Sequence, residues 1–159
     1  MDLVPWLLFA HILGAIVAFG PTFAFPMIGA AGGREPQHVN FALRISRTIA
    51  ERLVWPLALL QGVTGFALVL ALELDLLATE SRWLLAGIAL YAAALAMSYF
   101  VVLPNVRRLI EITSSPPPPG SSGPPPELLA RVAAGRRNGL IQLVLVIAIV
   151  ALMVLKPTF

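Results

Sequence analysis

One ionisable side chain, that of His11, lies inside a long apolar stretch of the sequence. An imidazole within a membrane helix needs a hydrogen-bond partner or a ligand, because hydrocarbon offers neither. Gly14 and Ala18 follow His11 at helical spacing and form a pair of small residues that lets another helix approach closely. We therefore expect His11 to point into a bundle of helices.

Thr64 and Tyr91 fall at a similar depth to His11 in two other apolar stretches. Counted from the outer ends, His11 lies about 8 residues deep, which is roughly 12 Å along a helix. One interpretation is that these three side chains form a layer of interhelical hydrogen bonds, each contributing about 0.6 to 2 kcal/mol. A second layer nearer the cytoplasm would hold Gln61, Ser98, Tyr99 and Gln142.

The alternative for His11 is a role as axial ligand of a b-type haem inside the bundle, with Thr64 and Tyr91 as partners in the same layer. The only other histidine is His38, which lies in a loop on the opposite side of the membrane. One chain therefore cannot hold a haem between two histidines. A five-coordinate haem, or two His11 side chains across a dimer, stays open.

The sequence contains no signature of a known catalytic site. Cysteine is absent, and so are the G-x-S-x-G, glycine-rich phosphate-loop and H-E-x-x-H motifs. No carboxylate lies inside an apolar stretch, whereas proton-driven transporters usually carry one there. These features argue against an enzyme, against a bound metal and against a transporter that works alone.

Four long apolar stretches must position these side chains. The chain is 58% hydrophobic and 12% charged, with a mean hydropathy of +0.88. A helix of about 20 such residues crosses the hydrocarbon core of roughly 30 Å. The sequence predicts a single all-α membrane domain, residues 1–159, that is a four-transmembrane-helix bundle. Its spans are predicted at about 3–30, 53–73, 83–105 and 138–156.

Arginine sets the expected orientation. Four arginines lie in the first loop and five in the third, whereas Arg82 and Lys156 alone lie on the other side. Positive loops stay in the cytoplasm, so we predict a bacterial cytoplasmic (inner) membrane protein with both termini outside the cytoplasm. No nucleic-acid partner is expected, because the arginines adjoin apolar runs. The loop arginines are Arg34, Arg44, Arg47, Arg52, Arg107, Arg108, Arg131, Arg136 and Arg137.

The cytoplasmic loops contain two further predicted segments. Residues 38–52 show helical apolar spacing and predict an amphipathic cytoplasmic helix before the second span, with Arg47 and Glu51 paired at i,i+4. Residues 113–126, TSSPPPPGSSGPPP, predict a proline-rich linker without helix or sheet. Pro21 and Pro26 are expected to kink or end the first helix.

Three segments resemble a bacterial domain-of-unknown-function family of predicted four-helix integral membrane proteins. They are 11–20 (HILGAIVAFG), 52–56 (RLVWP) followed by Thr64-Gly65, and 102–108 (VLPNVRR). That family is distantly similar to copper-resistance D type and HemJ-type membrane proteins, which share a first-helix histidine followed by a glycine. HemJ-type proteins pair this histidine with a lysine where this chain has Arg82, so the resemblance does not imply the oxidase activity. It implies a four-helix membrane fold and adds weight to haem b at His11.

The leading interpretation is a non-enzymatic multi-pass membrane protein that acts as an accessory or assembly component. The alternative is a haem b-binding redox or haem-handling protein that uses His11, and a weaker one is a partner subunit of a transporter. Expected partners are the lipid bilayer and either a second copy or another membrane protein. Surfaces for such association are offered by Gly14, Gly62, Gly65 and Gly87.

Overall fold

The computed structural model describes residues 3–76, 78–115 and 123–157, and every element in these ranges is helical. This confirms the all-α prediction. The α-helices are α1 (Val4–Arg34), α2 (Val39–Ile49), α3 (Trp55–Ala71), α4 (Arg82–Met97), α5 (Leu103–Ser114) and α6 (Pro126–Leu155). Two 3-10 turns, η1 (Pro36–His38) and η3 (Thr79–Ser81), and two π-helical segments, η2 (Ala50–Val54) and η4 (Ser98–Val102), connect them.

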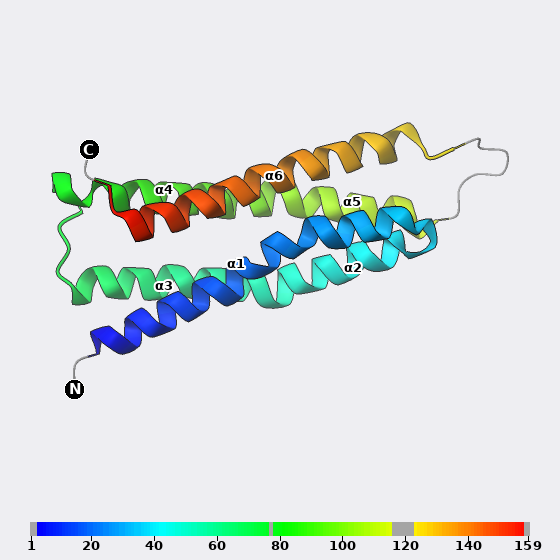
Figure 1. Ribbon diagram of the computed structural model, residues 1–159. Coiled ribbons are helices and arrows are strands. Elements are labelled where there is room, and N and C mark those ends of the chain that lie inside the picture. Colours follow the sequence, from blue (N-terminus) through cyan, green and yellow to red (C-terminus); the bar gives the residue numbers. More distant parts are fainter. Residues whose placement is uncertain (1–2, 77, 116–122, 158–159) are drawn as a thin grey trace.

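These elements join into long rods (Figure 1). Helix α2 continues through η2 into α3, and α4 continues through η4 into α5. Within the described ranges, four helical stretches are long and apolar enough to cross a membrane, which is the number expected. They are Val4–Arg34, Pro36–Ala71, Thr79–Ser114 and Pro126–Leu155.

Several prolines lie within these rods. Helix α1 contains Pro21 and Pro26 and continues to Arg34, so of the two expected effects, a kink or an end of the helix, the second does not occur. A π-helical segment directly precedes Pro56 at the start of α3 and Pro104 at the start of α5. A proline ring clashes with the carbonyl four residues earlier in a regular α-helix, and a wider π turn relieves that clash.

The two ends of the molecule differ (Figure 1). Both chain termini and the α3–α4 connection lie at one end, which we call the terminal end. The α1–α2 connection, the end of α5 and the start of α6 lie at the other. We call it the arginine-rich end, because the nine loop arginines lie in the helical parts that lead to it: the last residue of α1, α2 with η2, α5, and the first half of α6. Residues 116–122, which are half of the predicted proline-rich linker, lie outside the described residues. Thr113 and Ser114 are the last residues of α5, and Pro126 is the first of α6.

The helices pack as two pairs, α1 with α3 and α4 with α6, and α2 packs against α1 and α5. Helix α1 also touches α6, which joins the pairs. In the described part of the chain, no Cα of α3 lies within 8 Å of a Cα of α4. The most buried contacts use small residues, notably Ala18, Ala58 and Ala94, which permit close helix packing. Large apolar side chains cover much of the surface, as suits a protein surrounded by lipid.

Candidate functional site

His11 forms a polar cluster with two residues of α3. Its Nδ1 lies 2.9 Å from Thr64 Oγ1, and Gln61 Nε2 lies 3.1 Å from each of its ring nitrogens. Gln61 and Thr64 are three residues apart, so both face α1 from the same side of α3. We call these three side chains the His11 cluster.

The hydrogen bonds of the cluster favour one tautomer of His11. The Thr64 hydroxyl donates to the carbonyl oxygen of Gln61 at 3.1 Å, so its oxygen is left to accept a hydrogen bond from the imidazole. Nδ1 then carries the proton, and Nε2 is the acceptor for the Gln61 amide. We assign the neutral Nδ1–H form to His11 on this basis.

Two glycines make room for the His11 cluster. A Cβ added to Gly14 would lie 2.7 Å from Gln61 Oε1, and one added to Gly65 would lie 3.1 Å from His11 Cε1. Both distances are too short for ordinary carbon contacts. Gly14 and Gly65 therefore let α1 and α3 approach closely enough for the polar side chains to meet.

Tyr91, the third residue predicted for the His11 layer, bonds elsewhere. Its hydroxyl donates to the carbonyl oxygen of Ala58 at 2.6 Å. A Cβ on Gly62 would lie 2.8 Å from that hydroxyl, so Gly62 provides the space for it. Thr64 thus contacts His11. Tyr91 instead links α4 to α3 with its side chain, although, among the described residues, no Cα atoms of these two helices lie within 8 Å of each other.

The residues predicted for the second layer separate into three environments. Gln61 joins the His11 cluster, and Tyr99 lies exposed, with its ring 5.6 Å from that of Trp55. Ser98 and Gln142 do come together, because both line a small cavity at the centre of the bundle. Counting depth along each span could not show which way a side chain faces around its helix, and this caused the difference.

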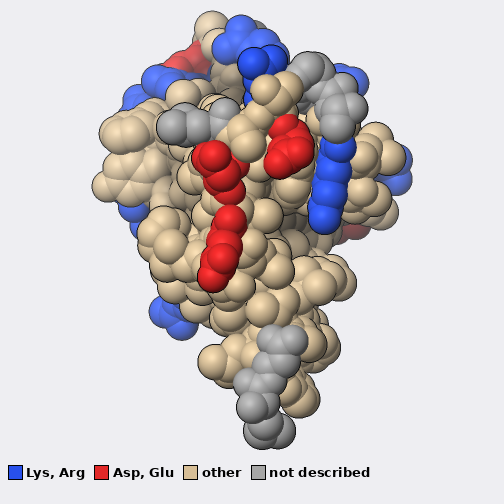
Figure 2. All heavy atoms as spheres, turned by 90° about the vertical axis from the view of Figure 1, so that its left-hand side faces the viewer, with Lys and Arg blue, Asp and Glu red and all other residues tan. Residues whose placement is uncertain are grey.

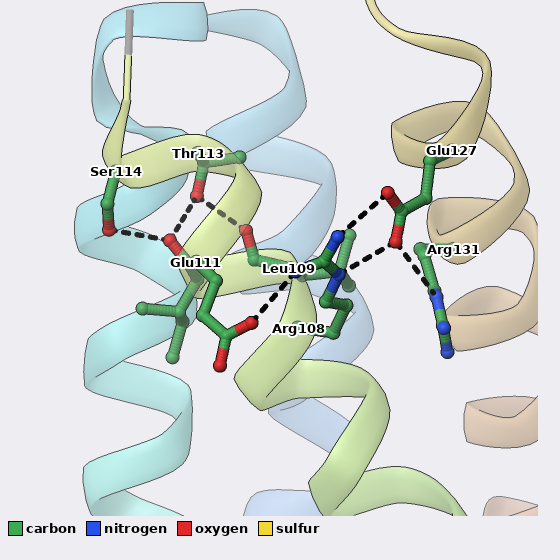
Figure 3. Close-up of polar contacts among 8 residues, drawn as sticks. Arg108, Leu109, Glu111, Thr113, Ser114, Glu127 and Arg131 are labelled. Carbon is green, nitrogen blue, oxygen red and sulfur yellow. Dashed lines mark hydrogen bonds and ion pairs between the residues drawn. The ribbon is translucent and has the colours of Figure 1, made fainter.

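Arg108 forms a clasp between α5 and α6 at the arginine-rich end (Figure 3). Its Nε and Nη2 donate to the two carboxylate oxygens of Glu127 at 2.7 and 3.0 Å, and its Nη1 donates to Glu111 at 3.1 Å. Arg131 lies 3.9 Å from Glu127. Glu127 precedes the predicted span 138–156, and the hydrogen bonds from Arg108 lower the pKa of its carboxyl group.

Two further contacts hold α2 and η2 against α5. Glu51 accepts hydrogen bonds from Arg47 at 2.9 Å and from Arg107 at 3.3 Å, so the Arg47–Glu51 pair predicted from i,i+4 spacing is confirmed. The amide of Asn40 donates to the Ile110 carbonyl at 3.0 Å, and it also reaches the hydroxyls of Thr113 and Ser114, the last two residues of α5. Side chains of α2 therefore fix the end of α5.

The second histidine, His38, lies beyond the end of α1 that is opposite to His11. His38, in η1, contacts Glu35 at 2.7 Å, and both residues are exposed. They border an open groove of about 380 Å³ between α1 and α2 that is otherwise lined mainly by apolar side chains. Among the described residues, no group of three His, Asp or Glu side chains is placed to bind a metal ion.

Acidic side chains gather at the terminal end, as Figure 2 shows from that side. The α3–α4 connection supplies Glu73, Asp75 and Glu80. Lys156 at the end of α6 places its Nζ 5.4 Å from the centre of the Trp83 ring. Arg82 also belongs to this end, so the terminal end is only slightly acidic, whereas the opposite end is strongly basic.

The comparisons identify a family for almost the whole chain. The sequence model of a family described as "Predicted integral membrane protein (DUF2269)" matches residues 5–157. No curated protein and no solved structure matches the chain.

Proposed function

Since the chain belongs to the DUF2269 family of predicted integral membrane proteins, we propose that it is a non-enzymatic multi-pass protein of a bacterial cytoplasmic membrane that serves as an accessory or assembly component. One observation carries this proposal. The polar side chains within the apolar parts of the helices bond across helices, as His11 does to Thr64, Tyr91 to Ala58 and Gln142 to Ala94. Hydrogen bonds of this kind stabilise the packing of helices in a membrane bundle.

The proposed orientation places the arginine-rich end in the cytoplasm and both termini outside. The arrangement of charge supports it, because nine arginines lie in the helical parts that lead to one end, whereas the terminal end is slightly acidic. Helix α2 would then be cytoplasmic. Its apolar face packs on α1 and α5, and Ala42 approaches Gly32 closely enough that a Cβ there would lie 2.9 Å away.

Helix length supports the same placement of α2. The continuous helix Val39–Ala71 contains 33 residues from α2, η2 and α3 and is about 50 Å long at 1.5 Å per residue. The hydrocarbon core is about 30 Å thick, so roughly 20 Å of this rod extends beyond it. We place α2, the end of α5 and the start of α6 in that extension, next to the lipid headgroups and the cytoplasm.

Haem b at His11 is the alternative, and it is inferred from the position of this histidine inside a span. Thr64 fixes the Nδ1–H of His11, which leaves Nε2 as the atom that could ligate iron. However, Gln61 Nε2 lies 3.1 Å from that atom, and Gly65 packs on the ring. A haem does not fit this packing, since α1 and α3 would have to separate to admit it.

The experiment that separates the two functions is an absorption spectrum of the protein purified from a haem-replete membrane. Spectra of the wild type and His11→Ala, each oxidised and then reduced with dithionite, would be compared. The proposed role as an accessory or assembly component predicts no reduced b-type band in either protein. A band present in the wild type and absent from the variant would establish the haem-binding function instead.

The accessory role has its own test. Cross-linking in native membranes, followed by mass spectrometry, should recover a second membrane protein joined to this chain. A detergent-corrected mass would also show whether two copies associate. Recovery of uncross-linked monomer alone, from membranes at the natural expression level, would contradict an accessory or assembly role.

A further inference from the structure

A small cavity lies where all four long helices converge. Its volume is about 30 Å³. Helix α1 contributes Thr22 to its lining, α4 contributes Tyr91, η4 contributes Ser98 and α6 contributes Gln142, and Ala58 of α3 closes another side. Ten residues line the cavity in all, and the rest of its lining is mainly apolar, so the polar groups of Thr22, Tyr91, Ser98 and Gln142 are set in apolar surroundings.

The side chain of Gln142 is only half satisfied. Its Nε2 donates to the carbonyl oxygen of Ala94 at 3.2 Å, whereas its Oε1 is buried without a hydrogen-bond partner. Rotating the amide by 180° would bring two oxygens together, so the bond to Ala94 fixes its orientation. An unsatisfied buried acceptor costs about 1–3 kcal/mol, and lipid supplies no bulk water to relieve that cost.

We propose that this cavity is an internal water site, occupied by one or two water molecules that donate a hydrogen bond to Gln142 Oε1. Cavities that stay dry are lined by apolar groups, whereas a polar cavity above about 10–15 Å³ with two to four polar partners holds water. This cavity exceeds that volume and offers Thr22, Tyr91 and Ser98 as further partners. The Tyr91 hydroxyl already donates to Ala58, so its oxygen accepts from the water.

The water site joins helices that lack a direct polar link. In the described part of the chain, no side-chain hydrogen bond connects α1 with α6, although the two helices touch. A water bound to Thr22 and Gln142 supplies that link. The site also adjoins both π-helical segments, because Val54 ends η2, Ser98 begins η4, and both line the cavity. Such segments are frequent at functional sites in helices.

Water-edited solid-state NMR of the protein in bilayers tests the proposal directly. The chain contains three glutamines, Gln37, Gln61 and Gln142, so glutamine labelled in its side-chain amide gives a short set of signals. Gln142→Leu would assign the signal of interest. If that variant does not fold, Gln37→Asn and Gln61→Leu assign it by elimination. Exposed Gln37 is the positive control, and a labelled methyl of Val146, buried one turn further along α6, is the negative control.

A bound water predicts early magnetisation transfer from water to the Gln142 amide. The build-up should accompany that of Gln37 and precede that of Val146. If Gln142 receives magnetisation as late as Val146, the cavity is dry and the proposal is wrong. Both build-up curves are recorded on the wild-type chain, and the variants serve only to assign its glutamine signals.

Discussion

At the scale of single residues, His11 stabilises the contact between α1 and α3 through Thr64 and Gln61. His11→Ala removes these bonds, and we expect the free energy of unfolding in bicelles to fall by about 1–2 kcal/mol, the range for interhelical bonds in membranes. Ile12→Ala is the control, because Ile12 is the next residue of α1 and is 51% exposed. An equal loss in both variants would show that the His11 bonds contribute nothing specific.

Position 14 requires glycine, because α3 lies too close to α1 there for a larger side chain. Gly14→Ala places a methyl group 2.7 Å from Gln61 Oε1, so Gln61 must move and the His11 cluster is disturbed. Gly20→Ala on the same helix meets nothing within 4 Å, and it should be neutral or stabilising by up to about 1 kcal/mol through helix propensity. We expect unfolding measurements to rank Gly14→Ala below the wild type and Gly20→Ala at or above it. The reverse order would contradict the packing described.

The sequence alone predicted only some of the residues of the His11 cluster. His11 stood out because it is the one ionisable residue in a span, and depth alone suggested Thr64 as a neighbour. Depth placed Tyr91 with His11 and Gln61 in the other layer, whereas Gln61 contacts His11 and Tyr91 does not, since the direction of each side chain depends on how the helices rotate against one another. That rotation follows from Gly14, Gly62 and Gly65, whose roles appear only when the opposing side chains are in place.

At the scale of helices, the Arg108–Glu127 clasp should hold the start of α6 on α5. Glu127→Gln weakens this clasp, and we expect faster hydrogen exchange, after correction for intrinsic rates, in the first turns of α6 at neutral pH. Glu111→Gln is the matched control, because Glu111 bonds the same arginine from within α5. Equal exchange in the two variants would show that the clasp does not fasten α6.

The same clasp should respond to acid in a defined direction. Its hydrogen bonds lower the pKa of the Glu127 carboxyl below the ordinary value of 4.5. A carboxylate with a lowered pKa stabilises the folded form above its unfolded pKa, and this contribution is lost as the pH falls through the folded value. Wild-type α6 should therefore approach the exchange of Glu127→Gln only below about pH 4.5. High salt should have a similar but weaker effect, because both side chains are exposed.

Helix boundaries were predictable where charge marks them and not where proline does. Apolar stretches between charged residues correctly indicated four helices of membrane-spanning length. Proline was a poorer guide, because Pro21 and Pro26, which were expected to kink or end the first helix, lie within α1 and do not end it. Neighbouring helices and π turns compensate the lost backbone bond, and neither can be read from one segment of sequence.

At the scale of the whole molecule, the proposed function requires a bundle that crosses the membrane with its arginine-rich end in the cytoplasm. Figure 1 places both termini and the α3–α4 connection at one end, so a single orientation fixes the side of each loop. The charge difference between the ends predicts that orientation through the preference of arginine for the cytoplasm. The fold does not reveal it, because a bundle can be inserted either way.

Thiol labelling tests this orientation most directly. The chain contains no cysteine, so no existing thiol has to be replaced before a single cysteine is introduced. Glu80→Cys would mark the α3–α4 connection and Gln37→Cys the α1–α2 connection, each in an otherwise cysteine-free chain. With a membrane-impermeant maleimide on intact spheroplasts, we expect Glu80→Cys to react at once and Gln37→Cys to react only after lysis. Reaction of Gln37→Cys before lysis, with Glu80→Cys protected, would reverse the orientation and contradict the account.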